Sequence, residues 1–279
     1  MERMELAVSD GERLGYAVWP AVGEQRRTIA VLHGIAFNGE PYGSIREDLP
    51  LEGTRLAALD LRGHGNSGGQ RGALPHYRKI IADVREWLVW LKEESPEQPL
   101  YVLGESMGAL YGTLFGRAYG GMISGLILVA PPAAPSMKQI LHLDTVRTVL
   151  SLAIPFRRHR VDLTGWRLAV GSADEDFINA RRTSSLAQSS VSIGYLTRLS
   201  QAMMGLGMAG RVRIDCPVLM AYGSDDRVVS PWGCRRLYSR IAAPDKAMIE
   251  VPGARHTVLW DPHRSVFYDG LARWIQEHE

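Results

Sequence analysis

The sequence predicts a three-layer α/β protein, in which a mostly parallel sheet of about eight strands lies between two layers of helices. Six short runs of apolar residues are bounded by Gly, Pro and Asp, as strands buried on both faces of a parallel sheet commonly are. Amphipathic stretches separate several of these runs, and this alternation favours a parallel sheet. Ligands of such sheets bind beyond the carboxyl ends of the strands. The residues that follow each run are therefore the first candidates for a site.

The predicted sheet begins with an antiparallel hairpin, and the six runs supply its remaining strands. Residues 4–9 and 13–20 alternate apolar and polar side chains around Asp10-Gly11-Glu12, a turn sequence. The six runs are residues 28–34, 55–63, 100–106, 125–132, 217–226 and 247–253. Between the second and third runs, residues 79–94 place five apolar side chains on one helical face: Ile80, Val84, Trp87, Leu88 and Leu91.

Residues 132–207 interrupt this alternation, because they contain helical patterns but no buried strand. The helical stretches are residues 137–156, 173–188 and 192–207. We interpret the region as a helical cap inserted after the sixth strand, over the carboxyl ends of the sheet. The chain then divides into a core of residues 1–131 and 208–279 and a cap of residues 132–207. The alternative is a long crossover that packs on a face of the sheet.

Composition and charge exclude several classes of protein. The chain has 279 residues, of which 46% are hydrophobic and 22% charged, as in ordinary globular proteins. Its net charge of +2 gives no basic surface for nucleic acid, and no apolar run approaches the roughly 20 residues that span a bilayer. The first residues lack a secretory signal pattern, and two cysteines, Cys216 and Cys234, are too few for a disulfide framework or a closed zinc site. We expect a cytoplasmic monomer or homodimer, with a mature secreted chain as the alternative.

Residues 104–108, Gly-Glu-Ser-Met-Gly, lie where the third run meets a helical stretch. At such a junction G-x-S-x-G is typical of a nucleophile elbow, a strained turn that raises the serine hydroxyl above the sheet. Gly104 and Gly108 lack Cβ atoms that would collide with the neighbouring strand and helix. The helix expected to begin near Met107 directs unpaired N–H groups toward a ligand beside Ser106. We predict that Ser106 is a nucleophile; a flexible surface loop is the alternative.

A serine nucleophile needs a base, and the base needs an acid to orient it. With this elbow the acid and the histidine are expected, in that order, after later strands. Among eight histidines only His256 directly follows the last run, since His263 and His278 lie on or near a helical stretch, so we predict that His256 is the base; a hydrogen-bonded surface histidine is the alternative. Asp225 and Asp226 both follow the fifth run and compete for the role of the acid. Alternatively, both aspartates only cap the turn.

The predicted reaction also needs two N–H groups for the oxyanion. The backbone N–H of Met107, directly after the nucleophile, is one expected donor. The other is expected from the loop after the first run, where Ile35 is the better candidate and Ala36 the second.

At this level of detail the sequence resembles the α/β-hydrolases, and within them the group of monoacylglycerol lipases and lysophospholipases, also called serine aminopeptidase-like. Leu59 to Gly72, LDLRGHGNSGGQRG, is similar to the group's Arg-Gly-His-Gly-x-Ser signature and its trailing Arg-Gly. Residues 76–88 resemble its next helix, and residues 253–261, GARHTVLWD, resemble its catalytic-histidine segment. The resemblance covers the whole chain except the cap.

The resemblance implies the α/β-hydrolase fold and narrows the site. In the group the acid lies in a Gly-x-x-Asp-x-x-Val pattern, which residues 223–229 match, so the resemblance selects Asp226 over Asp225. It also implies that the second oxyanion N–H belongs to the residue after His33-Gly34, which is Ile35.

We therefore expect a serine esterase or lipase that cleaves monoacylglycerols or medium-chain acyl esters through an acyl-enzyme. The mechanism needs neither a metal nor a cofactor. The alternatives on the same triad are a lysophospholipase, a thioesterase, an acyltransferase and a peptidase. An alternative of another class is a non-catalytic ligand-binding α/β-hydrolase.

Departures from the group bear on the substrate and leave the triad intact. Glu105 stands where the group usually has His, Ala109 where it has a second Gly, and Phe-Asn-Gly-Glu at residues 37–40 replaces Gly-Glu-His. The apolar cap stretches suit an acyl pocket. The basic residues 157–160 and 181–182 suggest contact between the cap and a lipid surface, with plainly solvated charges as the alternative.

Overall fold

The computed structural model describes residues 1–132, 160–162, 171–208 and 210–279. Its centre is an eight-stranded sheet with the order β1-β2-β4-β3-β5-β6-β10-β12. Both pairs that involve β2 are antiparallel, and all other neighbours are parallel. Each strand overlaps a segment that the sequence predicts, so the mostly parallel eight-stranded sheet is confirmed. The strands are β1 (Glu2–Ala7), β2 (Arg13–Trp19), β3 (Arg27–Leu32), β4 (Thr54–Leu59), β5 (Leu100–Glu105), β6 (Gly125–Val129), β10 (Val218–Gly223) and β12 (Lys246–Val251).

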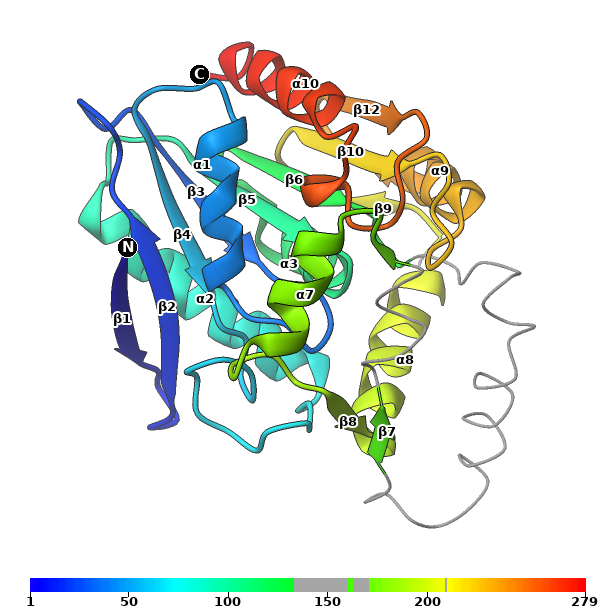
Figure 1. Ribbon diagram of the computed structural model, residues 1–279. Coiled ribbons are helices and arrows are strands. Elements are labelled where there is room, and N and C mark those ends of the chain that lie inside the picture. Colours follow the sequence, from blue (N-terminus) through cyan, green and yellow to red (C-terminus); the bar gives the residue numbers. More distant parts are fainter. Residues whose placement is uncertain (133–159, 163–170, 209) are drawn as a thin grey trace.

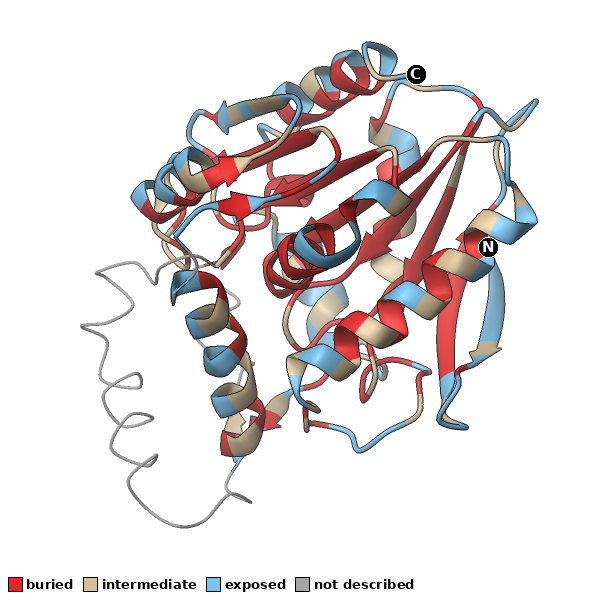
Figure 2. Cartoon of the chain, turned by 180° about the vertical axis from the view of Figure 1, so that it is seen from behind, coloured by how far each residue is buried: buried red, intermediate tan, exposed pale blue. Residues whose placement is uncertain are grey.

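Helices cover both faces of this sheet (Figure 1). Because side chains alternate along a strand, Val31 and Leu32 of β3 enter two separate apolar clusters, one on each face. Figure 2 shows that the central strands are buried, whereas the covering helices expose their outer sides. The first cluster includes residues of α2 (Tyr77–Glu94), α3 (Met107–Tyr119), α8 (Ile193–Met208) and α9 (Pro231–Arg240), and the second includes residues of α1 (Ile45–Asp48), α7 (Glu175–Thr183) and α10 (Ser265–Gln276).

Helix α2 follows the pattern that its sequence predicts. The five apolar residues expected on one face are all buried, and the helix begins two residues before the predicted start. His76 caps it by accepting a hydrogen bond from the backbone N–H of Arg78.

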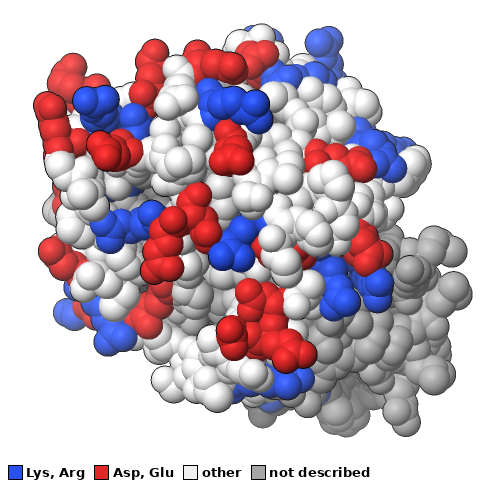
Figure 3. All heavy atoms as spheres, turned by 45° about the horizontal axis from the view of Figure 1, so that its top comes forward, with Lys and Arg blue, Asp and Glu red and all other residues white. Residues whose placement is uncertain are grey.

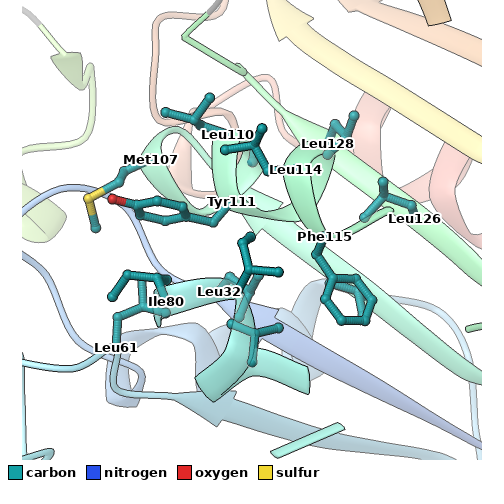
Figure 4. Packing of buried hydrophobic residues seen from close by; sticks show 14 of the residues in the cluster. Leu32, Leu61, Ile80, Met107, Leu110, Tyr111, Leu114, Phe115, Leu126 and Leu128 are labelled. Atoms are coloured by element: carbon teal, nitrogen blue, oxygen red, sulfur yellow. The ribbon is translucent and has the colours of Figure 1, made fainter. Parts of the chain in front are cut away.

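Helix α3 fixes the end of β5 from which the elbow projects. Its first ten residues, from Met107 to Gly116, are all buried. Leu110 and Leu114 belong to the same apolar cluster as Leu126 and Leu128 of β6 (Figure 4). This packing holds the start of α3 rigidly against the sheet.

The segment between β6 and β10 contains α7, which lies within the predicted helical stretch 173–188, and α8, which overlaps the stretch 192–207 and ends one residue beyond it. The third stretch, residues 137–156, lies outside the described residues. The short strands β7 (Arg160–Asp162) and β8 (Ser190–Ser192) pair antiparallel; the sequence did not predict them, because three residues show no measurable alternation. The boundaries of the cap, residues 132–207, stay a prediction.

Several short elements complete the described chain. β9 (Val212–Arg213) and β11 (Ile241–Ala242) form a parallel pair outside the main sheet. The 3-10 turns are η1 (Glu40–Ser44), η2 (Gly120–Met122) and η3 (Val258–Trp260).

Two global properties bear on possible partners. Within the described ranges, no helix is both long enough and apolar enough to cross a membrane. On the coloured part of the face in Figure 3, basic side chains lie among acidic ones and no large region carries a single sign of charge.

Candidate active site

The turn between β5 and α3 has the geometry of a nucleophile elbow. Ser106 takes φ 53° and ψ −115°, a backbone conformation that is strained for a residue with a side chain. A Cβ on Gly104 would lie 2.4 Å from the carbonyl oxygen of Gly108, and a Cβ on Gly108 would lie 1.9 Å from that of Leu32. These two glycines are therefore needed because β3, β5 and α3 approach one another too closely for any side chain.

The structure brings the three residues of the predicted triad together. His256 Nε2 lies 2.9 Å from Ser106 Oγ, and His256 Nδ1 lies 2.8 Å from Asp226 Oδ2. Asp226 Oδ1 accepts two further hydrogen bonds, from the backbone N–H groups of Val228 and Val229. Because a carboxylate only accepts, Nδ1 carries the proton and Nε2 is free to accept from the serine hydroxyl. All three side chains are buried.

The structure also separates the two candidate acids. Asp226 contacts His256, as the resemblance implied, whereas the side chain of Asp225 is 43% exposed and forms an ion pair with Arg227 at 2.8 Å. The two neighbours in sequence thus lie in different electrostatic surroundings.

The candidate oxyanion donors lie beside Ser106 in sequence or in space. Met107 is the first residue of α3, so its N–H has no acceptor within the helix. Gly34, which precedes Ile35, lies against Ser106: a Cβ on Gly34 would be 3.7 Å from the serine Cβ. Ala36, the second candidate, has φ 56° and is the strained residue of this loop.

His33 fixes the orientation of the peptide group that contains the Ile35 N–H. His33 Nε2 accepts a hydrogen bond from the N–H of Leu61 at 3.0 Å, so the ring carries its proton on Nδ1. That Nδ1–H donates to the carbonyl oxygen of Gly34 at 2.7 Å. Since a trans peptide points C=O and N–H in opposite directions, the Ile35 N–H points away from the His33 ring. Burial holds the pKa of His33 well below its usual value and keeps the ring neutral.

A buried carboxyl group, that of Glu105, directly precedes Ser106 in the chain. Tyr42 Oη–H donates to Glu105 Oε2, and the Tyr42 oxygen accepts the N–H of Gly34 at 3.0 Å. A Cβ on Gly34 would lie 3.0 Å from Glu105 Oε2, so a side chain at this position would be in tight contact with the carboxyl group. Tyr42 therefore connects the elbow to the loop that carries Ile35.

Two carboxyl groups near His256 oppose the effect of burial on its pKa, whereas the positive charge of Arg181 adds to that effect. Burial alone would lower the pKa of His256, but the carboxylate of Asp226, with a smaller contribution from Glu105, raises the pKa above its ordinary value of 6.5. Burial also raises the pKa of Glu105, and the hydrogen bond from Tyr42 opposes that rise.

Four aromatic rings, from Phe37, Tyr42, Phe177 and Trp260, pack into what we call the aromatic cluster. Phe177 of α7 stacks on Trp260 with ring centroids 4.3 Å apart, and Tyr42 meets Trp260 edge-on at 5.0 Å. Phe37 lies 5.9 Å from Trp260. The cluster joins α7, the loop after β3 and the segment after His256.

Sequence reasoning missed the parts played by Tyr42 and Arg181. Tyr42 contacts residues far away in sequence, so no local pattern identifies it. The sequence marks Arg181 only as a basic residue that could contact a lipid surface, whereas in the structure its guanidinium contacts the loop after β3. Glu105 could be suspected only as a departure from the resembled group.

No metal site is evident among the residues that the structure describes: no three His, Cys, Asp or Glu side chains are grouped to bind an ion. Both cysteines, Cys216 and Cys234, are free and buried, and burial raises the pKa of each thiol to about 12.

The eight-stranded sheet, the helices on both faces and the elbow at the end of β5 define an α/β-hydrolase. The family described as serine aminopeptidase, S33, matches residues 23–263, and the chain belongs to this family. Among curated relatives, a monoacylglycerol lipase from Mycolicibacterium smegmatis is 28% identical over 275 residues, which are 96% of this chain and 94% of the relative. The phospholipase YtpA of Bacillus subtilis is 24% identical, over 90% of this chain and 95% of the relative.

Solved structures agree on the fold. A soluble variant of monoglyceride lipase from Saccharomyces cerevisiae, in complex with a substrate analog, gives a TM-score of 0.83 at 20% identity, with 99% of this chain and 94% of that chain covered. The predicted resemblance to the monoacylglycerol lipase group is thus confirmed. Because the relatives named monoacylglycerol lipases belong to a family of carboxylic ester hydrolases, the predicted class of enzyme is confirmed as well.

Proposed function

We propose that the protein hydrolyses carboxylic esters of small lipids, above all monoacylglycerols and medium-chain acyl esters, with Ser106 as the nucleophile. The observation that carries the proposal is the hydrogen-bonded chain from Ser106 through His256 to Asp226, at 2.9 and 2.8 Å, which begins at a strained elbow. The names of the relatives support a lipid ester as the substrate.

In the proposed reaction His256 Nε2 takes the hydroxyl proton while Ser106 Oγ attacks the ester carbonyl carbon. The carbonyl oxygen becomes an oxyanion, held by the N–H groups of Ile35 and Met107. The alcohol leaves with the proton from His256, and an acyl-enzyme remains. A water molecule, deprotonated by the same histidine, attacks the acyl-enzyme; the acid is released as His256 returns that proton to Ser106 Oγ. Asp226 keeps the proton of the neutral imidazole on Nδ1 throughout.

The proposal extends to the region around the site. We propose that residues 132–207 form a cap that supplies the acyl pocket, because α7 and its neighbours contact the loops that follow β3 and β4. A cytoplasmic location, a monomeric or homodimeric state and contact with a lipid surface also stay predictions.

The test combines a covalent probe with a substrate series. We expect a fluorophosphonate to label the protein at Ser106, and p-nitrophenyl esters and monoacylglycerols to be hydrolysed faster than triacylglycerols. Lysophospholipids belong in the series because of the relative named phospholipase YtpA, and aminoacyl amides because of the family's description. Turnover of amides but not esters would overturn the assignment as an esterase, and a protein that is neither labelled nor active would overturn catalysis by this site.

The pH dependence of kcat/KM is expected to report on His256. Only the neutral imidazole accepts the serine proton, so activity falls as pH drops through the pKa of His256, which lies above 6.5. Glu105→Gln removes a nearby negative charge that raises this pKa. In this variant the fall of kcat/KM at acid pH is therefore expected to occur at lower pH than in the unchanged protein. The matched control is Glu93→Gln, an exposed residue of α2. If kcat/KM of Glu105→Gln falls at the same pH as that of the unchanged protein, the charge of Glu105 does not affect the pKa of His256.

A further inference from the structure

Arg181 of α7 contacts the loop that carries a candidate oxyanion donor. Its Nη2 donates a hydrogen bond to the carbonyl oxygen of Ile35 at 2.8 Å, and its Cζ lies 5.0 Å from the centre of the Phe37 ring. The side chain is half-buried. The guanidinium is therefore held by a hydrogen bond and by the face of an aromatic ring.

The loop that Arg181 contacts needs external support. Ala36 has φ 56°, and a residue with a side chain keeps such a conformation only when its surroundings fix it. Two consecutive carbonyl groups of this loop bind to the segment that contains α7: Ile35 C=O to Arg181, and Ala36 C=O to the backbone N–H of Gln188 at 2.9 Å.

The contacts of α7 make it a fixed support. Asp174 caps the helix by accepting the N–H of Phe177 at 2.8 Å, and Phe177 in turn stacks on Trp260 of the aromatic cluster. Gln188 Nε2 also donates to the carbonyl oxygen of Gly63 in the loop after β4. The helix is thus tied to the segment that follows His256 as well as to the loop after β3.

The segment between β6 and β10 also contacts Met107, the other expected oxyanion donor. Tyr195 of α8 lies with its hydroxyl 3.0 Å from Met107 Sδ and 3.0 Å from His64 Nε2. The residues that bear both candidate donor N–H groups are therefore in contact with side chains from between β6 and β10.

The positive charge of Arg181 is a second way in which this residue can affect the proposed reaction. Among the ion pairs of the described residues, none joins Arg181 to a carboxylate. Burial lowers the pKa of Arg181, and the negative charge of Glu105 opposes that effect. Because no ion pair of the described residues neutralises Arg181, its positive charge favours a transition state that develops negative charge nearby.

We propose that Arg181 is a positioning residue of the oxyanion hole, which holds the Ile35 carbonyl and thereby the turn that presents the Ile35 N–H. This inference rests on the proposed function. It makes the segment between β6 and β10 part of the catalytic apparatus, in addition to any contact that this segment makes with the substrate.

The test compares Arg181→Met and Arg181→Lys with the matched control Arg182→Met, the exposed neighbour on the same helix. A neutral ester, p-nitrophenyl butyrate, is the substrate, and active sites are counted with a fluorophosphonate. We expect Arg181→Met to lower kcat per active site about 10- to 100-fold with KM within about twofold, because a displaced donor weakens the transition state selectively. Arg181→Lys keeps the charge and is expected to recover part of the loss, and Arg182→Met is expected to match the unchanged protein.

A second measurement separates positioning from a merely structural role. A trifluoromethyl ketone adds to a serine as a hemiketal whose oxyanion occupies the hole, so its affinity is expected to fall by the same factor as kcat. If Arg181 only stabilised the fold, the number of active sites would fall while kcat per site and inhibitor affinity stayed constant, and the inference would be overturned. A change in KM alone would overturn it too, because it would assign Arg181 to substrate binding instead. An unchanged protein that does not react at Ser106 would overturn the proposed function itself.

Discussion

Ser106→Ala is expected to lower kcat for ester hydrolysis by about 10⁴-fold or more. The substitution removes the atom that forms the acyl-enzyme in the proposed reaction, and among the described residues no other hydroxyl group lies at hydrogen-bond distance from His256 Nε2. Residual turnover would come from water that uses the remaining oxyanion donors and the binding site.

The same substitution is expected to leave the fold intact. The strained turn depends on Gly104 and Gly108 and on the hydrogen bond from Ser106 N–H to Val129 at 2.8 Å, and alanine keeps all of these. The lost hydrogen bond to His256 is worth about 1 kcal/mol. Thermal unfolding with circular dichroism checks the fold, a p-nitrophenyl ester assay checks the activity, and Ser200→Ala on the exposed side of α8 is the control. A folded Ser106→Ala protein that retains kcat within tenfold would refute the nucleophile.

The parts of this molecule that the sequence predicts are those encoded in contiguous residues. Six strands of the main sheet are short apolar runs bounded by Gly, Pro or Asp, and the first two alternate apolar and polar residues around a turn, so all eight could be located without coordinates. The elbow is equally local, because Gly104 and Gly108 are required by the close approach of strand and helix at a fixed spacing from Ser106. His256 could be chosen because it follows a strand parallel to β5, and the carboxyl ends of parallel strands lie at the same end of the sheet.

The parts that the sequence does not predict depend on contacts between distant segments. Tyr42 reaches Glu105 across 63 positions, and Arg181 reaches Ile35 across 146, so no periodicity or motif marks either pair. Residues alone left Asp225 and Asp226 as equal candidates, since both follow the same strand. Their difference lies in three dimensions: Asp226 turns toward His256, and Asp225 turns toward Arg227.

Asp226→Asn is expected to lower kcat by roughly 10³- to 10⁴-fold, because it reverses the tautomer of the histidine. Asp226 Oδ1 accepts the N–H groups of Val228 and Val229, so the asparagine oxygen is retained there and its NH₂ group faces His256 Nδ1. An NH₂ group donates, and Nδ1 must then accept. The imidazole proton moves to Nε2, which can no longer take the proton of Ser106.

Asp225→Asn is the matched control, with the same change of charge at the neighbouring position. It weakens a partly exposed ion pair with Arg227, and we expect kcat close to that of the unchanged protein. The two variants are compared by single-turnover acylation with a p-nitrophenyl ester, which isolates the step that needs the serine proton removed. Because Asp226→Asn also removes the main charge that raises the pKa of His256, its remaining activity is expected to persist to lower pH. If Asp225→Asn loses more activity than Asp226→Asn, the acid has been assigned to the wrong residue.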